Sequence, residues 1–528
     1  MRFFGPLKTQ IQMTSALSAL SDPMGKAAAI AALVAAGFAQ PSPAGAVTYS
    51  PLTAPTGLSY TPPFVVSGGS DGTYKHDYDP ASNKPVATHT VYVDWRVADN
   101  SGDGLTWATR VRSLNMGMTK ANALGTGSSK PRILAYPGEY LYSNQDGSGV
   151  PDSFAGKSCT RTTLIVEACD NSGNPSNDSG KIISVHNTIL PAFVATSDAN
   201  VWVSTYTTEL VAKTSWDKTK LDTKGNPIGV PNVPDALNGN VSGIISAINA
   251  LNTLWGRGAF YIDTAAKKVY VRTWNGRQPD ANLFFGRGTT NGNDVNSRNF
   301  YLNGIYGNVT TVWARGLWTY GGCGMYGTTY MPDSSPSGVF KGWDCGTNYS
   351  SQCGIAWDGN FTSTLYRHTA DYNYKDGYNY DQSTGLDPSG TAVMRFHELD
   401  STGDWNGWDN NGDGSNNGSS AHFRAIGVRV NCTYDRTANR AIHDIIAAKS
   451  WNLGLTASNC RQTGLQSGAF VIGFLPNTGE TAQMWLDGCK SINNQYDIES
   501  YKGASLYYRN LTPATPVTDA QGGSISTY

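Results

Sequence analysis

Charge is scarce in this sequence, and neither sign is in excess. Only 15% of the 528 residues are charged, and 39 Lys and Arg against 40 Asp and Glu leave a net charge of −1. A nucleic-acid-binding surface needs a concentration of positive charge. We therefore do not expect nucleic acid as a partner.

The sequence also lacks the C-x₂-C spacing that is typical of a structural zinc site. Its eight cysteines stand at positions 159, 169, 323, 345, 353, 432, 460 and 489. Scattered cysteines in a large chain are usually buried apolar side chains, and we favour this interpretation. The alternative is a short disulfide loop in an oxidising compartment, joining Cys159 to Cys169 or Cys345 to Cys353.

No apolar run is long enough to span a membrane, which takes about 20 residues. The longest, AAAIAALVAAGFA at 27–39, follows Lys26 and precedes AGA at 44–46. One interpretation is a signal peptide that ends near Ala46. The other, which we favour, is a retained helix at about 17–39 followed by a Pro-rich arm, so that residues 1–88 form an attachment segment.

Glycine and aromatic residues are abundant, with 59 Gly, 28 Tyr and 14 Trp. This composition favours tight turns and aromatic β-surfaces. From residue 301 to about 508, short apolar strands alternate with turns, and Gly324, Gly354, Gly377 and Gly407 follow one another in steps of 30, 23 and 30 residues. Such steps are typical of a solenoid with one supersecondary unit per rung, so we predict an all-β solenoid.

The predicted domains follow from this pattern. Residues 89–199 form the first rungs, with a capping helix within 107–125 that covers the open end of the solenoid. Residues 200–290 leave the solenoid and contain a hairpin in which Tyr261 and Val269–Val271 flank a turn at 265–268. The main solenoid occupies 291–510, and 511–528 form a C-terminal tail.

Acidic residues are dense in two neighbouring predicted rungs and the loop that follows them. Asp371, Asp376 and Asp381 lie in the first rung, and Glu398, Asp400 and Asp404 lie in the second. Side chains one or two rungs apart on the same face lie roughly 5 or 10 Å apart, which brackets the carboxylate separations of retaining and inverting glycosidases. Asp376 with Glu398 or Asp400 is the expected acid and base pair, and Asp404 is a further candidate. The alternative is that these carboxylates only solvate turns.

Aromatic and basic residues surround these acids, as they would in a carbohydrate groove. The candidates for substrate binding are Tyr374, Tyr378, Arg395, His397, Trp405 and Trp408. A polysaccharide lyase is the alternative chemistry, with Lys375, Arg395 or His397 as the base that removes a proton from a uronate.

The segment DNNGDG at 409–414 matches the first half of a calcium loop, with Asp409, Asn411 and Asp413 at alternate positions. The twelfth position holds Ser420 in place of the Glu of an EF-hand. A solvated turn is the competing interpretation, so we expect no cofactor, with calcium as the alternative.

Two stretches together carry a family resemblance: THTVYVDWRVADNSGDGLTWATRVRSL at 88–114, continuing to YPGEY at 136–140, and SSAHFRAIGVRVNCTYDRTANRAIHDIIAAKSWNLGL at 419–455. They resemble right-handed parallel β-helix proteins of the pectate-lyase-like superfamily, most of all phage tailspikes and depolymerases. The N-T-D, G-H-D and R-I-K motifs of polygalacturonases are absent.

The resemblance implies a homotrimeric virion tail protein. Such a protein would bind, and could depolymerise, a bacterial surface polysaccharide, and it would contact other virion tail proteins through its N-terminal segment. A secreted bacterial lyase or glycoside hydrolase and a non-enzymatic adhesin or structural spike are the alternatives.

Overall fold

The computed structural model describes residues 47–144, 149–154, 156–176, 180–206, 211–233, 236–287, 298–303, 310–329, 338–382, 393–407, 416–460, 468–473 and 482–528. Residues 51–68 and 72–528 form one compact unit, and residues 1–50 and 69–71 belong to another. The helix predicted at 17–39 lies outside the described residues. Within those residues, no helix is both long and apolar enough to cross a membrane.

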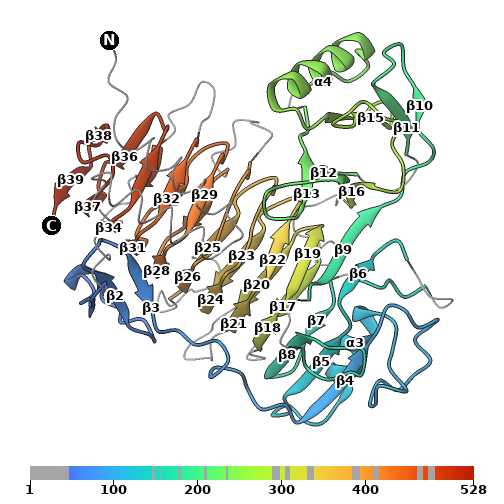
Figure 1. Ribbon diagram of the computed structural model, residues 1–528, viewed down its shortest axis with the longest axis horizontal. Coiled ribbons are helices and arrows are strands. Elements are labelled where there is room, and N and C mark those ends of the chain that lie inside the picture. Colours follow the sequence, from blue (N-terminus) through green and yellow to red (C-terminus); the bar gives the residue numbers. More distant parts are fainter. Residues whose placement is uncertain are drawn as a thin grey trace, which may run out of the picture. The chain divides into compact units, whose positions relative to one another are not determined.

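Two long sheets of parallel strands dominate the larger unit (Figure 1). The twelve-stranded sheet contains β4 (His89–Val93), β5 (Pro131–Ala135), β8 (Thr163–Ala168), β18 (Thr311–Arg315), β21 (Gly338–Trp343), β24 (Phe361–Tyr366), β26 (Arg395–Leu399), β28 (Ile426–Val430), β31 (Lys449–Leu453), β34 (Gln483–Asp487), β37 (Ser505–Arg509) and β39 (Ser524–Thr527). The ten-stranded sheet contains β7 (Ser158–Cys159), β17 (Phe300–Asn303), β20 (Met325–Thr329), β23 (Ile355–Gly359), β25 (Tyr378–Asp381), β27 (Ser419–Ala421), β30 (Ile442–Asp444), β33 (Gly468–Ile472), β36 (Tyr496–Tyr501) and β38 (Thr518–Gln521). Strands β38 and β39 extend both sheets into the segment that the sequence assigned to a tail.

A third, narrower face completes each turn of the chain. It contains β6 (Gly138–Leu141), β9 (Ile182–Thr188), β19 (Leu317–Gly321), β22 (Gly346–Asn348), β29 (Thr433–Asp435), β32 (Thr456–Ser458) and β35 (Lys490–Ile492). Single parallel bridges at Thr369 and Thr402 connect β22 to β29. Each turn, here called a rung, passes through the twelve-stranded sheet, the third face and the ten-stranded sheet. This arrangement is a parallel β-helix, and it confirms the predicted all-β solenoid.

Glycines stack where each rung enters the ten-stranded sheet. The strand register places Gly324, Gly354 and Gly377 in successive rungs, which confirms the predicted steps of 30 and 23 residues. The last predicted step, to Gly407, is wrong, because Gly418 stacks on Gly377. A Cβ atom on Gly377 would lie 2.6 Å from the carbonyl oxygen of Gly418, so only glycine lets these rungs approach.

Left-handed backbone conformations mark the corner between the twelve-stranded sheet and the third face. The φ angle is positive at Gly316, Asp344, Arg367, Asp400, Asn431, Gly454, Gly488 and Asn510. Glycine and, to a lesser degree, Asn and Asp tolerate this conformation best. The candidate residue Asp400 therefore occupies a corner position at which other rungs place asparagine.

The predicted capping helix is α3 (Leu114–Ala123). Its N-cap residue Ser113 accepts a hydrogen bond at its side chain from the backbone N–H of Met116 at 3.0 Å. Leu114, Met118 and Ala121 are buried in the main core, and Figure 1 shows α3 beside β4 and β5 at the first rungs.

Residues 189–282 leave the β-helix between β9 and β16 (Leu283–Arg287), which returns antiparallel to β9. The predicted hairpin is confirmed as β14 (Ala259–Asp263) and β15 (Lys268–Arg272), with Tyr261 opposite Tyr270. The excursion also contains β10 (Val194–Ala195), β11 (Trp202–Thr205), β12 (Val211–Leu221), β13 (Pro227–Val230) and one helix that the sequence analysis missed, α4 (Val241–Trp255).

An N-terminal arm, residues 51–68 and 72–88, covers the outer face of the twelve-stranded sheet. It contains η1 (Thr56–Leu58) and β2 (Val66–Gly69), which pairs with β3 (Tyr74–His76), while β1 (Tyr49–Pro51) spans the boundary of the two units. Apolar side chains of the arm pack on outward-facing residues of β28, β31 and β34, and the hydroxyl of Tyr74 donates to Asp487 at 2.7 Å. This part of the segment assigned to attachment thus belongs to the β-helix unit.

The cysteines support the apolar interpretation. Seven of the eight are buried, and neither Cys159 with Cys169 nor Cys345 with Cys353 forms a disulfide.

Candidate functional site

A recurring motif, Thr-x-Asp followed by an aromatic residue or Arg, marks the third face. It reads TADY at 369–372, TGDW at 402–405 and TYDR at 433–436. The carboxylate of Asp371 accepts a hydrogen bond from the backbone N–H of Asp404 at 2.8 Å, and Asp404 accepts one from Asp435 at 2.9 Å. Asn348 accepts in the same way from Asp371 at 3.0 Å. We call Asp371, Asp404 and Asp435 the acid ladder.

Aromatic residues directly follow Asn348, Asp371 and Asp404 and point outward from left-handed corners. Tyr349, Tyr372 and Trp405 have φ angles of 58°, 60° and 57°. Their rings stack, with centroids 5.5 Å apart between Tyr349 and Tyr372 and 6.5 Å apart between Tyr372 and Trp405. Trp216 of β12 stacks on Tyr349 at 4.9 Å, so the excursion packs on the same row of rings.

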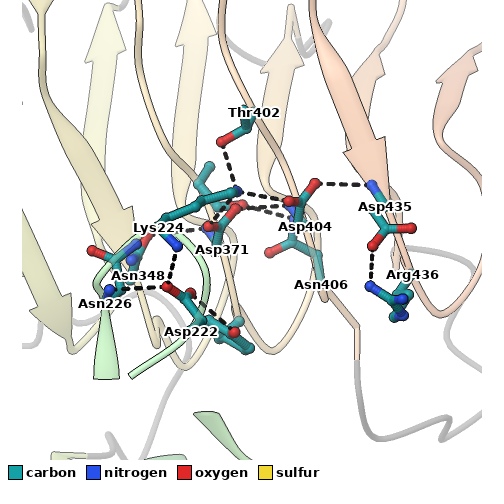
Figure 2. A network of polar contacts seen from close by, with 12 residues as sticks. Asp222, Lys224, Asn226, Asn348, Asp371, Thr402, Asp404, Asn406, Asp435 and Arg436 are labelled. Atoms are coloured by element: carbon teal, nitrogen blue, oxygen red, sulfur yellow. Dashed lines mark hydrogen bonds and ion pairs between the residues drawn. The ribbon is translucent and has the colours of Figure 1, made fainter. Parts of the chain in front are cut away.

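A lysine from the excursion lies on the acid ladder. In the turn DTKGN between β12 and β13, the Asp222 side chain accepts hydrogen bonds from the backbone N–H groups of Lys224 and Asn226, both at 2.9 Å. The Lys224 ammonium lies 2.7 Å from carboxylate oxygens of both Asp371 and Asp404, and it donates to the hydroxyl of Thr402 at 2.9 Å. Figure 2 shows this network.

The two carboxyl groups beside Lys224 have perturbed acidity. Burial raises the pKa of Asp371 to about 7, although Lys224 opposes the shift, and burial also raises the pKa of Asp404. One ammonium group balances only one carboxylate. We therefore infer that the Asp371–Asp404 pair retains a proton close to neutral pH.

A cavity of about 270 Å³ opens beside the acid ladder. Its further lining includes Lys224, Tyr372, Trp405, Trp255, Arg257 and Arg436. We call it the acid–aromatic cavity. The side chain of Asp371 is 0% exposed, whereas those of Asp404 and Asp435 are 14% and 18% exposed. A bound molecule would therefore meet Asp404 and Asp435 first.

Two of the candidates from the sequence, Asp404 and Trp405, lie in this cavity. The Arg257 guanidinium lies 3.6 Å from the ring centroid of Trp405, and the exposed Trp255 packs edge-on against the same ring. Tyr374 lies outside the cavity, where it bonds to Lys213 of β12. Arg395 lines a different cavity, described below.

Other candidates lie inside the β-helix. Glu398 is fully buried and accepts hydrogen bonds from Ser419 and Tyr434, each at 2.5 Å, and from Arg429 at 3.1 Å. Tyr378 is buried in the main core. Neither side chain is placed to contact a polymer outside the protein.

Other side chains of the protein or its backbone also form hydrogen bonds with three further candidates, Asp376, Asp400 and His397. The buried Asp376 accepts a hydrogen bond from the backbone N–H of Asn417 at 2.7 Å. Asp400 follows β26 at a corner and bonds to Asn431 at 3.1 Å, so the structure does not bring it together with Asp376. His397 is buried under the N-terminal arm, 2.7 Å from the hydroxyl of Tyr60.

The calcium hypothesis cannot be placed on the structure, because Asp409, Asn411 and Asp413 lie outside the described residues. The substrate-binding candidate Trp408 also lies outside them. Within the part of the chain that is described, no group of three or more His, Cys, Asp or Glu is arranged to hold a metal ion.

The sequence analysis missed Asp435 and Lys224 as site residues, and it noted Asp371 without selecting it. The Thr-x-Asp motif would have identified Asp371 and Asp435, because it recurs in three successive rungs. Lys224 has no such signal, since it comes from the excursion and reaches the ladder only through the fold.

Comparison with known proteins gives little further information. No protein-family model matches the chain, and no curated protein matches it. One similar solved structure is described as the complex structure of XylC with xylose, with a TM-score of 0.40 and 12% sequence identity over 83% of this chain and 68% of that one. A likeness at this level carries no inference about function.

Proposed function

We propose that this chain is a tailspike-type protein with a right-handed parallel β-helix, which binds a bacterial surface polysaccharide and hydrolyses it at the acid–aromatic cavity. The observation that carries the proposal is the pair Asp404 and Asp435. They reach one cavity from adjacent rungs, next to the exposed indole ring of Trp255 and the partly buried ring of Trp405.

The spacing of this pair suits glycoside hydrolysis. Adjacent rungs stack about 4.8 Å apart, close to the roughly 5–5.5 Å between the carboxyl groups of retaining glycosidases. Trp405 and Trp255 offer apolar surfaces to sugar rings, and Arg257 and Arg436 offer hydrogen-bond donors to hydroxyl groups.

The two carboxyl groups take different roles in the proposed reaction. Asp404, whose pKa is raised by burial, donates its proton to the glycosidic oxygen as the bond to the anomeric carbon breaks. Asp435, which pairs with Arg436, attacks that carbon as a carboxylate. Asp404 then takes a proton from water as the water oxygen bonds to the anomeric carbon, and the bond between that carbon and Asp435 breaks, which releases the sugar. Lys224 and Asp371 act as positioning residues that hold Asp404.

The test is incubation of the purified protein with a panel of bacterial surface polysaccharides, followed by assay of reducing ends. Asp404→Asn and Asp435→Asn should each lower the rate by about 10²-fold or more. Asparagine keeps the ladder bond, as Asn348 shows, so the loss would reflect the carboxyl group.

Asp400→Asn is the matched control, because asparagine occupies the same corner at 431 and 510. This variant should cleave at the normal rate. Full cleavage by Asp404→Asn and Asp435→Asn would refute the assignment. New ultraviolet absorbance from the C=C bond of unsaturated uronates would instead identify a lyase.

One observation favours a second candidate, an adhesin that binds the polymer without cleavage. Lys224 and neighbouring backbone groups already occupy the oxygens of Asp371 and Asp404. In an adhesin these bonds would only dock the excursion on the β-helix. Polymer binding without new reducing ends would support this alternative.

The proposal includes a homotrimer on a virion tail, attached through the N-terminal segment. Light scattering on the purified protein measures the number of chains. The alternative of a secreted enzyme predicts a mature chain about 5 kDa lighter, since a signal peptide would be removed, and mass spectrometry distinguishes the two.

A further inference from the structure

A second cavity, of about 550 Å³, lies on the outer face of the twelve-stranded sheet beside the N-terminal arm. Three cationic side chains line it: Arg395, Arg424 and Lys449. None of the described residues that line it is Asp or Glu. In a chain with a net charge of −1, three cations around one cavity form a local positive field. We call it the cationic cavity.

The strand register explains this gathering of charge. Arg395, Ile426, Lys449 and Gln483 occupy the first position of successive strands in the twelve-stranded sheet, so they form one row along the β-helix. Arg395 and Lys449 are two rungs apart, roughly 10 Å. A linear polymer that lies along the row would meet both cations.

The arm fixes the other side of the cavity. The Lys449 ammonium donates to the carbonyl oxygen of Gly57 at 3.0 Å. The hydroxyl of Tyr60 lies 2.7 Å from His397, and the Arg395 guanidinium carbon lies 5.9 Å from the centroid of the Tyr60 ring. An aromatic ring beside a guanidinium suits a sugar that carries a carboxylate, because the ring packs on C–H groups and the guanidinium binds the acid.

We propose that the cationic cavity is a second glycan site, which binds the uronate units of an acidic polysaccharide. This inference rests on the proposed function only in that it takes the ligand to be a glycan. It assigns the cavity to holding the polymer and leaves hydrolysis to the acid–aromatic cavity.

The experiment measures binding of an oligogalacturonate to the full chain at low salt by calorimetry. Its methyl ester is the matched ligand, since it has the same sugars without the charge. The double variant Arg395→Gln/Lys449→Gln should weaken binding of the oligogalacturonate at least tenfold and leave the weak binding of the ester unchanged. Circular dichroism checks that the variant is folded.

The matched control for charge is Lys490→Gln combined with Lys502→Gln, which removes two exposed cations outside the cavity. This variant should bind the oligogalacturonate normally. Equal losses in the two double variants would overturn the proposal, because the effect would then be general electrostatics. Unchanged affinity in Arg395→Gln/Lys449→Gln, or equally tight binding of the ester, would overturn it as well.

Dextran sulfate, a polyanion without carboxylates, separates uronate recognition from plain charge attraction. Binding of dextran sulfate as tight as that of the oligogalacturonate, with the same loss in the cavity variant, would overturn the uronate assignment. The two proposals fail separately. Cleavage that depends on Asp404 without uronate binding would sink only this inference, and uronate binding without any cleavage would sink only the hydrolase.

Discussion

The interior of the β-helix contains an ion network whose removal should cost stability. Arg429 is fully buried, with its guanidinium 3.1 Å from Glu398 and 3.0 Å from Asp444, and all three side chains are 0% exposed. The perturbation that we develop is Arg429→Met, which removes the cation and leaves both carboxylates inside the protein.

The structure sets the size of the expected loss. Removing one partner of a buried ion pair typically costs about 3–5 kcal/mol, because the other charge stays buried without compensation. Here two carboxylates lose their cation. Glu398 keeps the hydroxyls of Ser419 and Tyr434, and Asp444 keeps that of Ser450. These remaining bonds lead us to expect a loss of about 4 kcal/mol, within that range.

The assay is urea unfolding followed by tryptophan fluorescence. The control is Lys218→Met, which breaks an ion pair with Glu139. Both side chains of that pair are about one-third exposed, so its loss should cost less than about 1 kcal/mol. The triple variant Glu398→Gln/Arg429→Met/Asp444→Asn should be more stable than Arg429→Met alone, since none of these three buried positions then carries a charge. A loss no larger than the control, or no gain in the triple variant, would refute the reasoning.

Three further predictions address the fold and the site. Gly377→Ala should destabilise the protein by about 1–3 kcal/mol in the same assay, because its Cβ would meet backbone atoms of the next rung, whereas Gly127→Ala, with nothing within 4 Å, should be neutral. Burial lowers the pKa of His397 from 6.5 to about 3; the unfolded state therefore binds the proton first, and this side chain should cost about 2 kcal/mol of stability at pH 5. Burial also lowers the pKa of His368 and His443, so His397→Gln should reduce the fall in stability on acidification by its own share and leave the rest. Lys224→Met should raise the pKa of Asp404 further and move the alkaline limb of the pH–rate profile upward; an unmoved limb would show that Lys224 does not tune this carboxyl group.

Much of the fold could be predicted from the sequence because a parallel β-helix repeats its constraints in every rung. The stacking of Gly324, Gly354 and Gly377 is one such constraint, since a side chain there would meet the neighbouring backbone. The predicted step from Gly377 to Gly407 was wrong because the rung that runs from β25 to β27 is longer than the rung that runs from β23 to β25. Spacing alone does not reveal which of two glycines stands at the stacked position.

The candidate site could be predicted only in part. Asp404 and Trp405 were found because acids and aromatic residues gather near them. Glu398 was selected from the same density, but the alternation along RFHEL places it on the inward face with Phe396. The alternation of inward and outward side chains along a strand can thus be read from the sequence, and it distinguishes carboxyl groups in the interior from those on the surface.

The acid ladder and the excursion depend on each other for a physical reason. Stacking places carboxylates in adjacent rungs, where like charges repel at short range. A cation of the β-helix itself can balance an acid in a neighbouring rung, as Arg429 does for Glu398, but Asp371 and Asp404 are followed by aromatic residues, and the compensating charge beside them comes from outside the repeat. Lys224 supplies it from the turn between β12 and β13. The excursion therefore supplies the cation beside the acidic residues that stand in register on the third face, and the same contact opposes the rise in pKa that burial gives to Asp404, the carboxyl group that we assign to catalysis.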